Sequence, residues 1–68
     1  MNNKLGMAIN YQNIGSIKES QNDLEKALIY YKKSLDLNEK INSDIGRIIC
    51  YNSIGSIYLK QKKAKKSH

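Results

Sequence analysis

The residues that could do chemistry are few and do not form a catalytic set. The chain of 68 residues has one cysteine, Cys50, and one histidine, His68, which is the last residue given. A histidine at a chain end is not held in place as a general base. A single cysteine allows neither an internal disulfide nor a zinc site built on paired cysteines. We therefore expect no enzyme activity, no catalytic residue, no metal site and no cofactor, and we interpret Cys50 as a partly buried, inert thiol.

The positive charge is concentrated at one end of the sequence. The formal net charge is +6, and five of the twelve cations lie in the last nine residues: Lys60, Lys62, Lys63, Lys65 and Lys66. Such a lysine tail could bind the phosphates of a nucleic acid. Residues 1–59 hold seven cations and six anions, so the remainder is nearly neutral. We favour a solvated chain end or the start of a further helix, and keep a small nucleic-acid-binding protein as the alternative.

An internal repeat with an offset of forty residues organises the chain. Residues 6–17 (GMAINYQNIGSI) and 46–57 (GRIICYNSIGSI) share Gly, Ile, Tyr, Ile, Gly, Ser and Ile at matching positions. The chain therefore contains one full unit and the beginning of a second.

The apolar residues follow helical spacing, not the alternation of strands. Leu24, Ala27, Leu28, Tyr31 and Leu35 form one stripe, and a second stripe on the same segment implies two neighbouring helices. Polar residues at 20–23 and 42–44 favour turns and caps. We predict helices at about 4–20, 23–40 and 44–60. Residues 61–68 form a basic tail or a truncated next helix, and one long third helix running through the lysines is the competing prediction.

The helix–turn–helix units resemble tetratricopeptide repeats. Tyr11 and the Ile14-Gly15 pair are similar to the family's first helix, while Ala27 and Tyr31 are similar to its second. A period of forty resembles a longer-repeat subgroup found in bacterial signalling proteins. The resemblance implies an all-α fold, a fragment of an α-solenoid with three antiparallel helices and a basic tail. It also implies a protein–protein interaction module or scaffold, within a signalling or regulatory protein.

The resemblance places a peptide-binding groove on the polar sides of the first and third helices. In such arrays these helices line a concave surface, and we expect an unidentified protein or peptide partner there. The residues at the matching positions are Ile9, Gln12, Asn13, Ser16, Glu19, Ile49, Asn52, Ser56 and Lys60.

The third helix carries apolar residues with no full partner helix after it. We predict a self-association surface of Ile54, Ile57, Tyr58 and Leu59, because an uncovered apolar patch favours association. Either the chain is part of a longer array that covers the patch, or copies of it form a homo-oligomer. No stretch is long and apolar enough to span a membrane. We expect a cytoplasmic location and leave the periplasm open.

Overall fold

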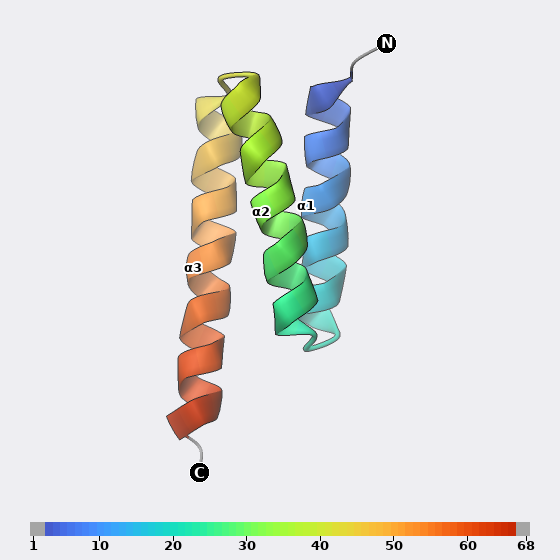
Figure 1. Ribbon diagram of the computed structural model, residues 1–68. Coiled ribbons are helices and arrows are strands. Elements are labelled where there is room, and N and C mark those ends of the chain that lie inside the picture. The colour runs from blue at the N-terminus through green and yellow to red at the C-terminus, as the bar shows by residue number, and fades with distance from the viewer. Residues whose placement is uncertain (1–2, 67–68) are drawn as a thin grey trace.

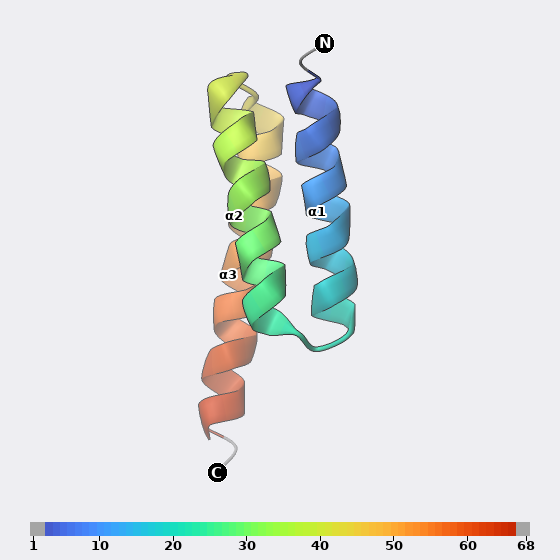
Figure 2. The same cartoon turned by 45° about the vertical axis from the view of Figure 1, so that its right-hand side comes forward.

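Three antiparallel helices make up the fold. The computed structural model describes residues 3–66, without the side chains of residues 64–66. The helices are α1 (Lys4–Ser20), α2 (Leu24–Lys40) and α3 (Asp44–Lys66), and α2 packs against both of the others (Figure 1). Figure 2 shows that α3 extends past the ends of α1 and α2. The predicted all-α repeat fold is thus confirmed. The second helix, α2, has two neighbouring helices, as its two apolar stripes predicted.

Asparagines in the left-handed backbone conformation end the first two helices. Asn22 has φ 65° and Asn42 has φ 59°, a region that asparagine tolerates better than most residues. The backbone N–H of Asp23 donates to the carbonyl of Lys18 at 2.8 Å, and that of Ser43 donates to the carbonyl of Asn38 at 2.9 Å. These bonds satisfy helix-end carbonyls and reverse the chain sharply. Asn22 therefore closes α1, and the N-cap position of α2 is Asp23.

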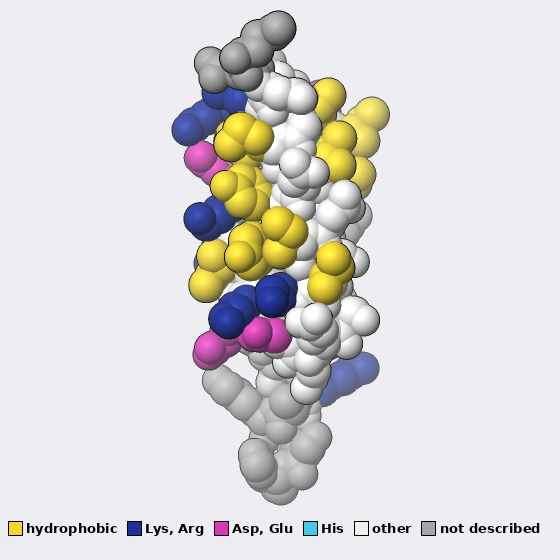
Figure 3. All heavy atoms as spheres, turned by 90° about the vertical axis from the view of Figure 1, so that its right-hand side faces the viewer, with side chains coloured by type: hydrophobic (Ala, Val, Ile, Leu, Met, Phe, Trp, Pro, Cys, Tyr) yellow, Lys and Arg dark blue, Asp and Glu magenta, His cyan; other side chains and the backbone are white. Residues whose placement is uncertain are grey.

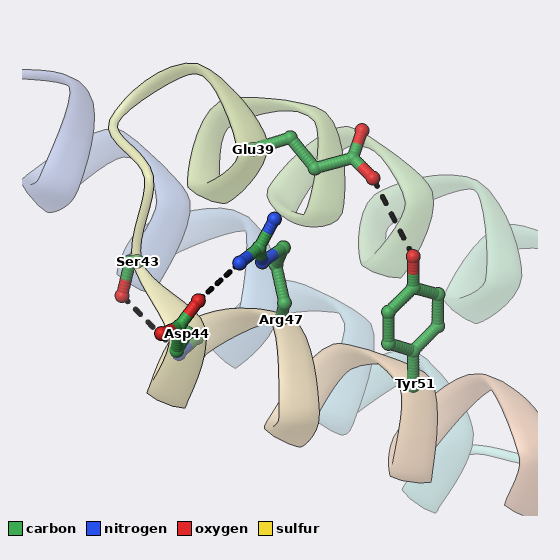
Figure 4. A network of polar contacts seen from close by, with 6 residues as sticks. Glu39, Ser43, Asp44, Arg47 and Tyr51 are labelled. Atoms are coloured by element: carbon green, nitrogen blue, oxygen red, sulfur yellow. Dashed lines mark hydrogen bonds and ion pairs between the residues drawn. The ribbon is translucent and has the colours of Figure 1, made fainter.

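The N-termini of the helices are capped unequally. Asn3 accepts a hydrogen bond from the N–H of Gly6, and Ser43 accepts one from the N–H of Gly46 at 3.2 Å. Asp23 occupies the N-cap position of α2 but accepts no side-chain capping bond. Around the start of α3, Arg47 pairs with Asp44, and the Tyr51 hydroxyl donates to Glu39 of α2 at 3.4 Å (Figure 4). The first contact lies within α3, and the second joins the beginning of α3 to the end of α2.

The hydrophobic core lies where α2 meets its neighbours. Ala27, Tyr31 and Ile57 are buried together, and Leu24, Leu28 and Ile54 pack around them. Gly15 of α1 lies against this cluster. A Cβ atom at Gly15 would stand 2.9 Å from the Tyr31 ring. The small residue therefore lets α1 approach α2 closely, as glycine does at other close helix contacts.

A second buried region is polar. Ser34 donates to the carbonyl of Ala8 at 2.7 Å, which ties α2 to α1. Asn38 donates to the Ser34 carbonyl at 2.9 Å and lies 3.5 Å from the sulfur of Cys50 on α3. Among the described residues, no buried side-chain nitrogen or oxygen lacks a hydrogen-bond partner. Satisfied polar groups in an interior favour one arrangement of the three helices over others.

The third helix does not end near residue 60, as the first of the two alternatives predicted. Residues 61–66 continue α3, as the alternative of one long third helix predicted. The reason lies at the position forty residues after Asn22. That position is Lys62, which favours a helix interior and not the left-handed conformation that closes α1. Ser67 and His68 lie outside the described residues.

Candidate functional site

A hollow of about 190 Å³ separates the N-terminal halves of α1 and α3. Its walls are mainly apolar, and Ile9 and Ile49 lie on opposite sides with exposed side chains. Gln12 adds a carboxamide to the α1 wall. The full lining is Leu5, Ala8, Ile9, Gln12, Asn38, Ser43, Ile45, Gly46 and Ile49. This hollow can take an apolar side chain and offers hydrogen-bonding groups beside it.

The other end of the same groove is closed by a charged network around Glu19. Lys60 of α3 donates to Glu19 at 2.6 Å, and Ser56 lies 3.5 Å from the same carboxylate oxygen. The hydroxyl of Tyr31 donates to the second carboxylate oxygen at 2.8 Å. Glu19 therefore joins all three helices, through partners 12, 37 and 41 residues away in sequence.

The titration of this network follows from its contacts. The hydrogen bond from Lys60 holds the pKa of Glu19 below its ordinary value, with Tyr31 contributing in the same direction against the effect of burial. Burial raises the pKa of Tyr31, and the neighbouring Glu19 carboxylate raises it further. At neutral pH Glu19 is thus ionised and Tyr31 protonated. Because the pKa of Glu19 is lowered on folding, its contribution to stability is lost as the pH falls through that pKa.

The predicted groove residues divide into three groups. Ile9, Gln12 and Ile49 line the apolar hollow, while Glu19, Ser56 and Lys60 form the charged network. Ser16 is exposed, and its hydroxyl is close enough to Tyr31 to influence that group's pKa. Asn13 and Asn52 are exposed and belong to neither part. Leu5 and Ile45 also line the hollow, but the sequence analysis did not predict them. The signal that could have identified them is an apolar residue at the second position of α1 and of α3.

The predicted self-association surface needs one correction. Ile57 is fully buried between α2 and α3, with a side chain 0% exposed, so it cannot belong to an exposed surface. Ile54 is half-buried against the same core. Tyr58 and Leu59 are exposed, as predicted. The sequence indicates that no full helix follows α3, but it does not show that α2 covers the face of α3 that carries Ile57.

The internal repeat identifies the face of α3 that remains open. Ala8 of α1 is 1% exposed under α2, whereas Ile48, its equivalent on α3, is 59% exposed. A Cβ atom at Gly15 would touch Tyr31, but a Cβ atom at Gly55 would meet nothing within 4 Å. We call Ile48, Tyr51, Gly55 and Tyr58 the open face of α3. Their counterparts on α1 are Ala8, Tyr11, Gly15 and Lys18. The open face therefore consists of the residues that in α1 lie toward α2.

The described residues hold no cluster of acidic, histidine and cysteine side chains suited to a metal ion. Cys50 is fully buried against Ser34 and Asn38, more deeply than the partly buried thiol that the sequence predicted. None of the helices described is long and apolar enough to cross a membrane. The candidate site lies between two like helices, α1 and α3, with α2 between them.

Comparison with known proteins agrees with this architecture. The family model described as Tetratricopeptide repeat matches residues 8–41, which comprise most of α1, the first turn and α2. No curated protein and no solved structure matches the chain. Within the matched residues, α1 and α2 pack against each other, with a close contact at Gly15. The chain belongs to the tetratricopeptide repeat family.

Proposed function

We propose that this chain is a protein-interaction unit that binds a segment of its partner in the groove between α1 and α3. The observation that carries the proposal is the apolar hollow between Ile9 and Ile49, which stays open while the core beneath it is closed. Family membership supports an interaction role, because tetratricopeptide repeats are typically non-catalytic modules that bind proteins.

The chemistry of the groove favours a partner with an apolar anchor. Leu5, Ile9, Ile45 and Ile49 surround the hollow, so an aliphatic or aromatic side chain placed there would lose water contact on several sides. At the other end, Glu19 and Lys60 neutralise one another. The groove therefore does not require a charged partner, and polar groups such as Gln12 would fix the orientation of the segment.

Replacing Ile9 by aspartate should abolish this binding. The probe is a peptide selected from a random display library on the immobilised protein, and its affinity is measured by isothermal titration calorimetry. A carboxylate in the apolar hollow should weaken binding by at least about tenfold. Ile17→Asp is the matched control, because Ile17 is also an exposed isoleucine of α1 but does not line the hollow. Equal affinities for the two variants would contradict the proposal.

We also propose that the open face of α3 mediates self-association. Tyr51, Tyr58 and the neighbouring Leu59 are exposed along it, and Gly55 leaves room for close approach of another helix. Tyr58→Asp should therefore lower the mass measured by sedimentation equilibrium at high protein concentration. Ile29→Asp, which places the same charge on an exposed apolar residue of α2, should leave the mass unchanged. An unchanged mass for Tyr58→Asp would count against the proposed surface.

The finer roles inferred from the sequence stay predictions. A place within a signalling or regulatory protein depends on the resemblance alone, and the cytoplasmic location also stays a prediction. The nucleic-acid alternative predicts binding that weakens steeply with salt. Of the lysines near the end of the chain, Lys60 is paired with Glu19 and Lys63 also interacts with another group. No observation favours this alternative over protein binding.

A further inference from the structure

A second groove runs along α1 and α2 on their outer side, away from the hollow between α1 and α3. It has a volume of about 510 Å³, larger than that hollow. Its apolar part consists of Met7, Tyr11, Ile29 and Leu37, and Met7 and Ile29 are exposed. We call this the outer groove. On the face that Figure 3 shows, hydrophobic side chains form two groups, separated by a strip of uncharged side chains and backbone. Basic and acidic side chains lie beside one of these two groups.

The floor of the outer groove is held in place by aromatic contacts. The rings of Tyr11 on α1 and Tyr30 on α2 stack with centroids 6.1 Å apart and planes 27° apart. The ammonium group of Lys33 lies 5.7 Å from the centre of the Tyr11 ring. Because each ring already has a partner, the floor is formed before any ligand arrives. A ligand side chain would pack beside these rings, between Met7 and Ile29.

The rim of the outer groove is positively charged. An adjoining hollow of about 290 Å³ shares Ile29 and Lys33 with it. Four lysines line the two hollows together: Lys18, Lys26, Lys32 and Lys33. Asp36 is the one acidic residue that lines either of them, and it pairs with Lys40 at 3.3 Å. Within the described part of the chain, neither Lys18 nor Lys32 forms an ion pair, so their charges are available to a ligand.

We propose that the outer groove binds an acidic protein segment that carries an apolar or aromatic anchor residue. The anchor occupies the floor between Met7 and Ile29, and flanking carboxylates face the lysines that line the two hollows, Lys33 among them. Charge complementarity selects an acidic segment. The apolar floor favours a protein segment with an apolar side chain over a phosphate-rich polymer, because Met7, Ile29 and Leu37 offer apolar contacts and no hydrogen-bonding groups.

The test uses a fluorescein-labelled synthetic peptide in which a Phe-Leu pair is flanked by Asp and Glu residues. Fluorescence anisotropy measures its binding to the intact chain at physiological salt. We expect saturable binding that Lys33→Glu weakens by at least about tenfold. Ile29→Ser should weaken it as well, through loss of the apolar floor. Lys62→Glu makes the same charge change on α3 and should leave the affinity within about twofold of the original chain.

Several results would overturn the proposal. Absence of saturable binding at protein concentrations up to about 1 mM would do so, as would equal affinities for Lys33→Glu and Lys62→Glu. Equal binding of a peptide with serines in place of the Phe-Leu pair would show attraction to charge alone. Displacement by polyadenylate RNA at lower concentration than by unlabelled peptide would assign the surface to nucleic acid.

Far-UV circular dichroism confirms that each variant is folded, and unchanged binding by Ile9→Asp separates this groove from the one between α1 and α3.

Discussion

Replacing Ile57 by alanine is expected to lower the free energy of unfolding by about 2 to 4 kcal/mol. Ile57 is 0% exposed and packs with Ala27 and Tyr31 where α3 meets α2. Removing its outer carbons loses apolar burial and leaves a cavity that rigid helices fill incompletely. A three-helix chain of this size has a small total stability, so the loss is a large fraction of the whole. Urea unfolding followed by circular dichroism measures it.

The internal repeat supplies a matched control for this change. Ile17 is the equivalent of Ile57 forty residues earlier, but it is 56% exposed. Ile17→Ala should therefore change the free energy of unfolding by less than about 0.5 kcal/mol. If Ile57→Ala does not fold, Ile57→Val provides a smaller step of about 0.5 to 1.5 kcal/mol. Equal losses at positions 17 and 57 would show that the packing of α3 on α2 is not as described.

Replacing Gly15 by valine should destabilise the fold by about 1 to 3 kcal/mol. The new Cβ atom would lie 2.9 Å from the Tyr31 ring and 3.3 Å from the carbonyl oxygen of Ala27. A backbone oxygen cannot move aside cheaply, and a displaced Tyr31 would lose its hydrogen bond to Glu19. Strain at Gly15 therefore reaches both the core and the charged network. Thermal unfolding at low protein concentration gives the size of the effect.

Gly55→Val is the counterpart on the third helix. Its Cβ atom would meet nothing within 4 Å, so the free energy of unfolding should change by less than about 0.5 kcal/mol in dilute solution. The same residue type in the same repeat position thus gives two different outcomes, because α2 covers Gly15 of α1 but not Gly55 of α3. A loss at Gly55 equal to that at Gly15, in the dilute protein, would contradict an open face on α3.

Much of the architecture follows from local sequence signals. Helical spacing of Leu24, Ala27, Leu28, Tyr31 and Leu35 predicts α2 and its orientation, and the two stripes of α2 predict two neighbours. Asp36 and Lys40, four positions apart in the sequence, form an ion pair at 3.3 Å. These features depend on residues three, four or seven positions apart. Within one helix, such spacing fixes which side chains are neighbours.

Features that depend on contact between helices were harder to predict. The burial of Ile57 and the exposure of Ile17 arise from the same sequence motif in two surroundings. Likewise the bond between Glu19 and Lys60 joins residues 41 positions apart. One sequence shows that two segments are alike, but not which face of each is covered. Which face of α1 and of α3 is covered depends on where α2 packs between them.

The end of α3 illustrates a different kind of limit. The repeat predicts a turn near residue 62 by analogy with Asn22, yet Lys62 lacks the tolerance for positive φ that closes α1. Local backbone preference therefore outweighed the repeat pattern. The outer groove was missed for another reason. Its apolar part combines Met7 and Tyr11 of α1 with Ile29 and Leu37 of α2, and it forms only when these two helices pack together.

Isoleucine methyl NMR tests most directly whether the groove between α1 and α3 is the partner-binding surface. The protein is labelled at its isoleucine methyl groups and titrated with the display-selected peptide. We expect the largest shifts at Ile9, Ile45 and Ile49, which line the hollow, and no shift at Ile17 or Ile29. Saturable binding that shifts Ile29 or Ile17 and leaves Ile9 and Ile49 unchanged would contradict the proposed groove.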